Sequence, residues 1–206
     1  MKNRRFALLS VSDKKGIETL ARGLVDLGFE ILSTGGTAGS IKEAGLPVTM
    51  VADYTTAPEI MNGRVKTLHP KIHGGILARD CEEHLEDLAM IHASLIEMVV
   101  VNLYPFERTA AVPSVKLHEL IEQIDIGGPC MLRAAAKNFE RVAAICDPHD
   151  YDDVLWHLSH EGEIPAAVRF ELAKKAFEHT AAYDAAISGA LPDFELETGC
   201  RRGDGR

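Results

Sequence analysis

Short runs of apolar residues alternate with helical patterns along this chain, and this alternation constrains the fold more than any other feature. Three predominantly apolar runs, at residues 6–11, 98–103 and 142–146, have the length of strands. Continuous apolar runs of this length are typical of strands that a parallel sheet buries on both faces. Two weaker strands are predicted at 29–32 and 48–51, after turns that contain glycine.

Helical patterns separate these runs. The helix predicted at residues 16–27 places Ile17, Leu20 and Leu24 on one face. Strands that alternate with helices form βαβ units, so the sequence predicts an α/β fold of three layers with a mostly parallel central sheet. We expect one domain over residues 1–191 and a flexible tail over 192–206. The further predicted helices span residues 37–44, 82–96, 114–123, 128–138, 150–159 and 165–188.

The charge balance argues against several classes of partner. The chain has 22 Lys and Arg against 31 Asp and Glu, a formal net charge of −9. Nucleic-acid binding usually needs a basic face, so we expect no nucleic-acid partner. No apolar run approaches the roughly 20 residues that cross a bilayer, and the N-terminal apolar stretch is too short for a signal peptide. We therefore expect a cytoplasmic protein with no membrane partner.

Two predicted strands end in segments suited to an anion. Residues 32–37 (LSTGGT) combine two glycines with a helix start, and residues 10–14 (SVSDK) place two hydroxyls and a lysine before the next helix. Helix N-termini at the carboxyl edge of a parallel sheet bind anions. A tight strand-to-helix turn that binds nothing is the alternative for the first segment. Helix capping by Ser12 or Asp13 is the alternative for the second, and a cap and an anion pocket can occur together there. Two such edges in consecutive βα units favour one shared pocket.

Residues 63–75 (GRVKTLHPKIHGG) read as an irregular loop that carries three Lys and Arg residues. Arg64 and Lys66 flank Val65 and would face one way in an extended segment. A solvated basic loop is the alternative. His69 and His73 have the spacing of a zinc-binding helix. Proline lies between them without the usual glutamate, so no metal site is predicted.

Four more polar residues follow predicted strands or enter helices. Asn102 and Tyr104 lie two apart at a strand end, so we expect both to face one crevice. Asp125 precedes the helix at 128–138, and Lys137 follows three alanines, which would desolvate its amine and lower its pKa. The alternatives are packing for Tyr104, helix entry for Asp125 and an exposed helix position for Lys137.

Several segments together resemble one family. VSDK, STGGT, GRVKTLHPKIHGGILAR, NLYPF, QIDIGGP, MLRAAAKN and KAFEHTAAYDAAI are similar, in order over residues 6–191, to the N-terminal cyclohydrolase domain of AICAR transformylase/IMP cyclohydrolases. The resemblance implies a methylglyoxal-synthase-like domain. It also implies a hydrolase-class enzyme of purine biosynthesis that closes FAICAR (5-formamidoimidazole-4-carboxamide ribotide) to IMP with loss of water, without cofactor or metal.

The resemblance also assigns site residues. It implies catalytic roles for Lys66, Tyr104, Asp125 and Lys137, with Lys66 on the oxyanion and Lys137 as proton donor and acceptor. The residues that it implies for nucleotide binding are Ser12, Asp13, Lys14, Thr34, Gly35, Gly36, Thr37, Arg64, Val65, Lys66, Thr67, Val101, Asn102, Asp125 and Ile126.

One departure from the family concerns length. The family's transformylase domain is absent from these 206 residues, so we expect no formyl transfer from this chain. A separate transformylase partner is left open, and family members form homodimers. Two other functions on this fold remain alternatives. One is a non-catalytic nucleotide-binding regulatory domain, and the other is methylglyoxal synthase, which uses a carboxylate base.

Overall fold

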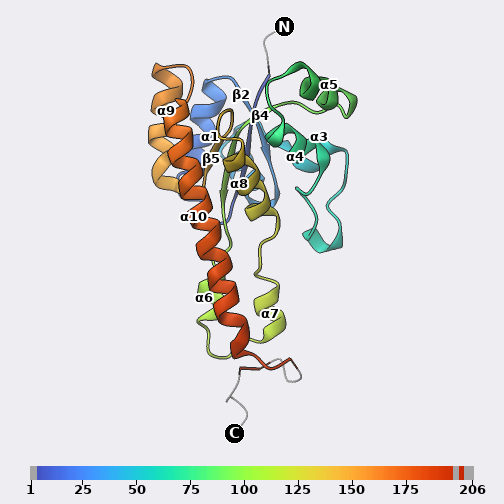
Figure 1. The fold of residues 1–206 in the computed structure, drawn as a ribbon, viewed down its shortest axis with the longest axis vertical. Helices are drawn as coiled ribbons and strands as arrows, with labels where there is room; N and C mark the ends of the chain where they lie inside the picture. Colours follow the sequence, from blue (N-terminus) through green and yellow to red (C-terminus); the bar gives the residue numbers. More distant parts are fainter. Residues whose placement is uncertain (1–3, 197–199, 202–206) are drawn as a thin grey trace.

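A five-stranded sheet with every strand parallel forms the centre of the protein (Figure 1). The structure, a computed structural model, describes residues 4–196, 200 and 201. The strand order is β3-β2-β1-β4-β5, and all five predicted strands are present. They are β1 (Arg5–Val11), β2 (Phe29–Ser33), β3 (Thr49–Met50), β4 (Ile96–Asn102) and β5 (Ala143–Ile145).

Two hydrophobic cores lie on opposite faces of this sheet, because successive strand residues point to opposite sides. In β1, Phe6 and Leu8 join one core while Ala7 and Leu9 join the other. The first core packs against α4 (Pro70–Leu77), α8 (Gly127–Lys137) and α10 (Ala166–Ala190). The second packs against α1 (Ile17–Asp26), α2 (Gly35–Glu43) and α9 (Tyr151–His160). The predicted three-layer α/β fold is confirmed.

Several predicted helices differ in extent. The helix predicted at 82–96 ends early, as α5 (Glu82–Met90), because β4 begins at Ile96. The one predicted at 114–123 is the single turn α7 (Leu117–Ile121). Short elements that the helical pattern is too brief to reveal are α3 (Val51–Thr55), α6 (Phe106–Ala110) and the 3₁₀ turns η1 (Met61–Gly63), η2 (Pro148–Asp150) and η3 (Leu191–Asp193).

Helix α10 runs well past the sheet, and its C-terminal half lies beside α6 and α7 (Figure 1). Phe106 and Tyr183 pack edge to face there, with ring centroids 6.2 Å apart. In the segment expected to be a flexible tail, Phe194 is buried and pairs with Arg201 in an isolated bridge. Residues 197–199 and 202–206 of that segment lie outside the described residues. No helix in the described part of the chain has the length and apolar character to cross a membrane.

Candidate functional site

Two adjoining cavities lie at the carboxyl ends of β1, β2 and β4. The main cavity has a volume of about 580 Å³ and the side cavity about 160 Å³. Ser10, Thr34, Lys66 and Tyr104 line both, so the two cavities form one continuous site. Of the predicted residues, the main cavity also contains Arg64, Thr67, Asp125 and Ile126, and the side cavity Ser12, Lys14, Gly35, Gly36 and Thr37.

The side cavity is built around the start of α2. The first N–H groups of a helix have no partner within the helix, so Gly35, Gly36 and Thr37 present theirs to the cavity. The Lys14 side chain lies across this turn, and its Nζ is 3.5 Å from the position that a Cβ on Gly36 would occupy. Backbone donors, a helix dipole and a lysine therefore converge on a space of phosphate size.

Hydrogen bonds fix the strand ends around this space. Ser10 Oγ and Thr34 Oγ1 are 3.0 Å apart, and Thr37 Oγ1 both donates to the Val11 carbonyl and accepts from its N–H, each at 3.0 Å. Thr37 therefore ties α2 to the end of β1. Its hydroxyl is occupied by these two hydrogen bonds to Val11, so Thr37 presents only its N–H group to the cavity.

Asn102 does not line either cavity. Its Oδ1 accepts the N–H groups of Ser12 and Asp13 at 2.6 and 2.9 Å, and its Nδ2 donates to the Asp13 carbonyl. Tyr104, by contrast, is half exposed and lines both cavities. The prediction that both side chains face one crevice is wrong for Asn102, because the turn after β1 uses its whole amide.

Asp125 is the most buried carboxylate of the main cavity. Its Oδ1 accepts the Gly128 N–H at 2.9 Å. Burial raises the pKa of this carboxyl above its ordinary value, although hydrogen bonds from the Gly128 and Gly127 N–H groups act in the opposite direction. A carboxyl of this kind exchanges a proton more readily near neutral pH than an exposed one.

Tyr183 and two glycines hold Asp125 in place. The Tyr183 hydroxyl accepts the Asp125 N–H at 2.8 Å and donates to the Gln123 carbonyl at 3.1 Å. A Cβ on Gly128 would lie 2.4 Å from Asp125 Oδ2, and one on Gly127 would lie 2.8 Å from Thr67 Oγ1. The IDIGGP segment therefore needs both glycines to bring Asp125 and Thr67 to the cavity wall.

The segment at 63–75 is only partly irregular. Helix α4 begins at Pro70, which suits a first helical position because proline lacks the N–H that would be unpaired there. His69 caps this helix, its Nδ1 accepting the Lys71 N–H at 3.1 Å. His73 lies one turn along and is half-buried, and this partial burial lowers its pKa. Within the described residues no three His, Cys, Asp or Glu side chains are grouped to hold a metal ion.

Arg64 and Lys66 both line the main cavity, as their alternation with Val65 predicts. Val65 itself pairs with Ile60 in an isolated antiparallel bridge and is not a lining residue. Arg64 forms an ion pair with Glu122, which also lines the cavity. This pair joins the segment before α4 to the segment after α7 across the mouth of the site.

Three other predicted residues lie away from the cavity walls. Val101 is buried in the core. Asp13 accepts the Lys15 N–H in the turn after β1. Lys137 is exposed, at the last residue of α8. It lies ten residues beyond Gly127, about 15 Å along the helix axis. The prediction that neighbouring alanines desolvate its amine is wrong, since those alanines face the core and Lys137 does not.

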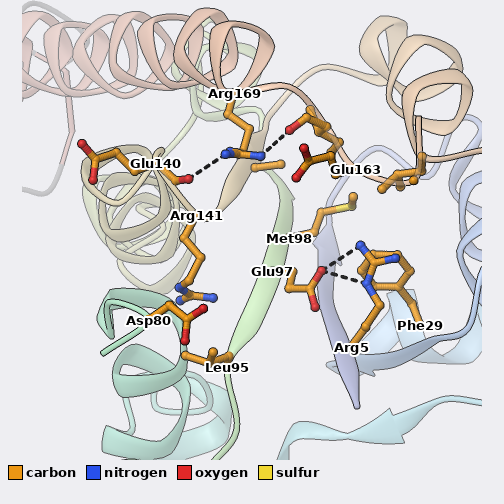
Figure 2. A pocket seen from close by; sticks show the side chains of 14 residues that line it. Arg5, Phe29, Asp80, Leu95, Glu97, Met98, Glu140, Arg141, Glu163 and Arg169 are labelled. Atoms are coloured by element: carbon orange, nitrogen blue, oxygen red, sulfur yellow. Dashed lines mark hydrogen bonds and ion pairs between the residues drawn. The ribbon is translucent and has the colours of Figure 1, made fainter. Parts of the chain in front are cut away.

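A third cavity, of about 430 Å³, opens near the amino ends of β1 and β4 (Figure 2). The arginines that line it already have partners. Arg5 Nη2 lies 2.9 Å from Glu97 Oε2, and Arg169 donates to the Glu140 carbonyl at 2.6 Å. We interpret this cavity as part of the scaffold.

Comparison with known proteins matches the chain to a family. Residues 16–130 match the MGS-like domain, and residues 135–202 match the AICARFT/IMPCHase bienzyme family. The chain is 58% identical over 189 residues to the bifunctional purine biosynthesis protein PurH of Desulfitobacterium hafniense strain DCB-2, covering 92% of this chain and 36% of that protein. It is 55% identical to PurH of Anoxybacillus flavithermus, covering 95% and 38%.

A solved structure gives the same result for the fold. The crystal structure of ForH superposes with a TM-score of 0.82 at 40% identity, covering 92% of this chain and all of that one. The chain spans only about 36% of the length of the first PurH relative. The chain therefore belongs to the MGS-like domain family, as a member that corresponds to the IMP cyclohydrolase part of the AICARFT/IMPCHase bienzymes.

Proposed function

We propose that this chain is an IMP cyclohydrolase, which closes FAICAR to IMP and releases water. The observation that carries the proposal is the continuity of the two cavities, with a phosphate-sized anion site beside Lys66, Tyr104 and Asp125. A nucleoside monophosphate has the same two parts, a phosphate and a base. The relatives named as bifunctional purine biosynthesis proteins support the same assignment. We expect the enzyme to act in the cytoplasm.

The reaction sets three chemical demands. A carboxamide nitrogen is a weak nucleophile and has to lose a proton as it attacks the formyl carbon. The formyl oxygen becomes an oxyanion as the new C–N bond forms, then takes up protons and leaves as water. The two reacting groups belong to one ring, so holding them in the right geometry supplies much of the rate.

The lining residues meet these demands. The first turn of α2 and Lys14 bind the phosphate, and Lys66 donates to the oxyanion from the boundary of the two cavities. Asp125, in its charged form, accepts the carboxamide proton, and Tyr104 relays a proton to the departing oxygen. Preorganised donors of this kind make the largest single contribution to the rate enhancement of many enzymes.

Lys137 and the homodimer stay predictions of the resemblance. Within one copy, Lys137 lies at the opposite end of α8 from the main cavity, so the proposal assigns the proton steps to Asp125 and Tyr104. Replacing Lys137 by alanine tests whether it takes part, and sedimentation velocity tests the homodimer.

A spectrophotometric assay with FAICAR tests the proposed function. We expect the purified chain to form IMP with Michaelis–Menten kinetics. FAICAR binding without turnover would point to the regulatory nucleotide-binding alternative. Turnover of dihydroxyacetone phosphate without turnover of FAICAR would point to methylglyoxal synthase.

The buried carboxyl of Asp125 predicts a pH dependence. Because burial raises its pKa, the charged base is lost as the pH falls through a value above the ordinary 3.8 of an exposed aspartate. We expect kcat to fall on the acid side at a correspondingly higher pH, and Asp125→Asn to lower kcat and remove this limb. The measurement is kcat against pH for both proteins.

Asp152→Asn supplies the matched control, since Asp152 is exposed on α9 and lines neither cavity. It should keep both the rate and the acid limb. An unchanged acid limb in Asp125→Asn would assign the titrating base to another residue.

A further inference from the structure

A short hairpin-like turn carries Lys66 to the site. Ile60 and Val65 form an antiparallel bridge in which each N–H donates to the other's carbonyl, at 3.2 and 3.4 Å. Residues directly outside such a pair face each other across the two strands. Glu59 and Lys66 occupy these positions, and Glu59 Oε2 lies 3.3 Å from Lys66 Nζ.

Gly63 makes room for this ion pair inside the turn. A Cβ on Gly63 would lie 2.6 Å from Lys66 Cε and 3.0 Å from Lys66 Nζ, closer than real side chains allow. The backbone of Gly63 also has a φ of +84°, a conformation that favours glycine. The lysine side chain therefore lies back across the turn, directly against its backbone.

The same ammonium also reaches the anion site. Lys66 Nζ is 3.9 Å from the position of a Cβ on Gly35, the first residue of α2. Helix α2 presents N–H donors here, and a helix N-terminus repels a cation. Among the described residues, Lys66 forms its ion pair with Glu59. The negative charge of the Glu59 carboxylate offsets this repulsion.

We propose that Glu59 is a positioning residue that holds the Lys66 ammonium at the boundary of the two cavities. Gly63, which has no side chain, leaves the space that the Lys66 side chain occupies. Glu59 is absent from the lining of both cavities, so it acts through Lys66 and not on the substrate. The effect on turnover rests on the proposed function, whereas the effect on the lysine itself does not.

Glu59→Gln tests the proposal because it removes the charge and keeps the shape. We expect kcat for FAICAR to fall about 10- to 100-fold, because a small displacement of a catalytic group lowers the rate by about that factor. KM should stay nearly unchanged, since the lost interaction acts in the transition state. Glu83→Gln, on an exposed position of α5, makes the same change of charge away from the site and should leave kcat unaltered.

The double variant Glu59→Gln/Lys66→Ala separates positioning from a merely structural role. If Glu59 acts through Lys66, the double variant is no slower than Lys66→Ala alone. Losses that multiply would overturn the proposal, as would wild-type kcat in Glu59→Gln.

A readout without turnover keeps the proposal testable if FAICAR proves not to be the substrate. Acetylation by an amine-reactive ester, mapped by mass spectrometry, reports how freely each lysine amine reacts. Glu59→Gln should raise the labelling rate of Lys66 several-fold and leave that of Lys42, exposed on α2, unchanged. Equal labelling of Lys66 with and without Glu59 would refute the positioning role. Absence of FAICAR turnover in the wild-type chain would instead count against the proposed function.

Discussion

Lys66→Ala is expected to lower kcat for FAICAR ring closure by about 10² to 10³, the usual loss when one oxyanion donor is removed. Lys66 lines both cavities, and its amine lies beside the first turn of α2 and beside Glu59. Removing it leaves the oxyanion without its charged donor. Because the charge develops only as the C–N bond forms, kcat and kcat/KM should fall together while KM changes little.

The fold should survive this change. Both partners of the Lys66–Glu59 pair are about one third exposed, and ion pairs of that kind contribute about 0–1 kcal/mol to the free energy of unfolding. Urea unfolding of Lys66→Ala should therefore match the wild type closely. Lys42→Ala, at an exposed lysine of α2, controls for loss of one positive charge and should keep full turnover. Near-wild-type kcat in Lys66→Ala would remove Lys66 from the mechanism.

The sheet could be predicted because its strands are buried on both faces. Runs such as residues 98–103 have few polar interruptions. In a chain that also contains amphipathic helices, a continuous apolar run of that length is typical of a strand that helices cover on both faces. The carboxyl ends of parallel strands lie at one edge, so the place of the side cavity could be predicted from residues 10–14 and 32–37. Both predictions depend on local pattern and on topology.

The parts of the site that could not be predicted depend on contacts between distant segments. The hydroxyl of Tyr183, 58 residues after Asp125, accepts the backbone N–H of Asp125, and no local pattern indicates such a contact. Lys137 shows the opposite error, since three neighbouring alanines are compatible with either a buried or an exposed lysine. Helix α4 was not predicted, because proline does not fit the interior of a helix. Pro70 is instead the first residue of α4, where proline is accepted.

Arg141 also joins segments that are distant in the sequence, and its guanidinium lies half-buried at the wall of the third cavity (Figure 2). Its Nε donates to the Ala78 carbonyl at 2.8 Å, and its Nη1 donates to the Ile96 carbonyl at 3.0 Å. Its Nη2 donates to the carbonyls of Gly75 and Ile76 at 2.7 and 2.9 Å. One side chain thus supplies donors to the C-terminal end of α4, where helix carbonyls have no partner within the helix, and to the start of β4. Asn138 Nδ2 also donates to the Ile76 and Ala78 carbonyls, at 2.7 and 3.0 Å.

Arg141→Ala is expected to lower the free energy of unfolding by about 2–6 kcal/mol, because two partly buried carbonyls lose their side-chain donor and each such group costs about 1–3 kcal/mol. These are the carbonyls of Gly75 and Ile96, whereas those of Ile76 and Ala78 keep the donor from Asn138. Arg141→Lys should recover little, since an ammonium is a point donor and cannot span carbonyls from two elements. Urea unfolding with linear extrapolation measures both variants.

Arg108→Ala gives the matched control, at an exposed arginine of α6, and should change the free energy of unfolding by less than about 0.5 kcal/mol. The comparison also separates scaffold from site. Arg141 lies at the amino edge of the sheet and Lys66 at the carboxyl edge, so any Arg141→Ala protein that remains folded should retain its kcat. A loss of kcat at full stability would show that the position of α4 controls the segment that carries Lys66.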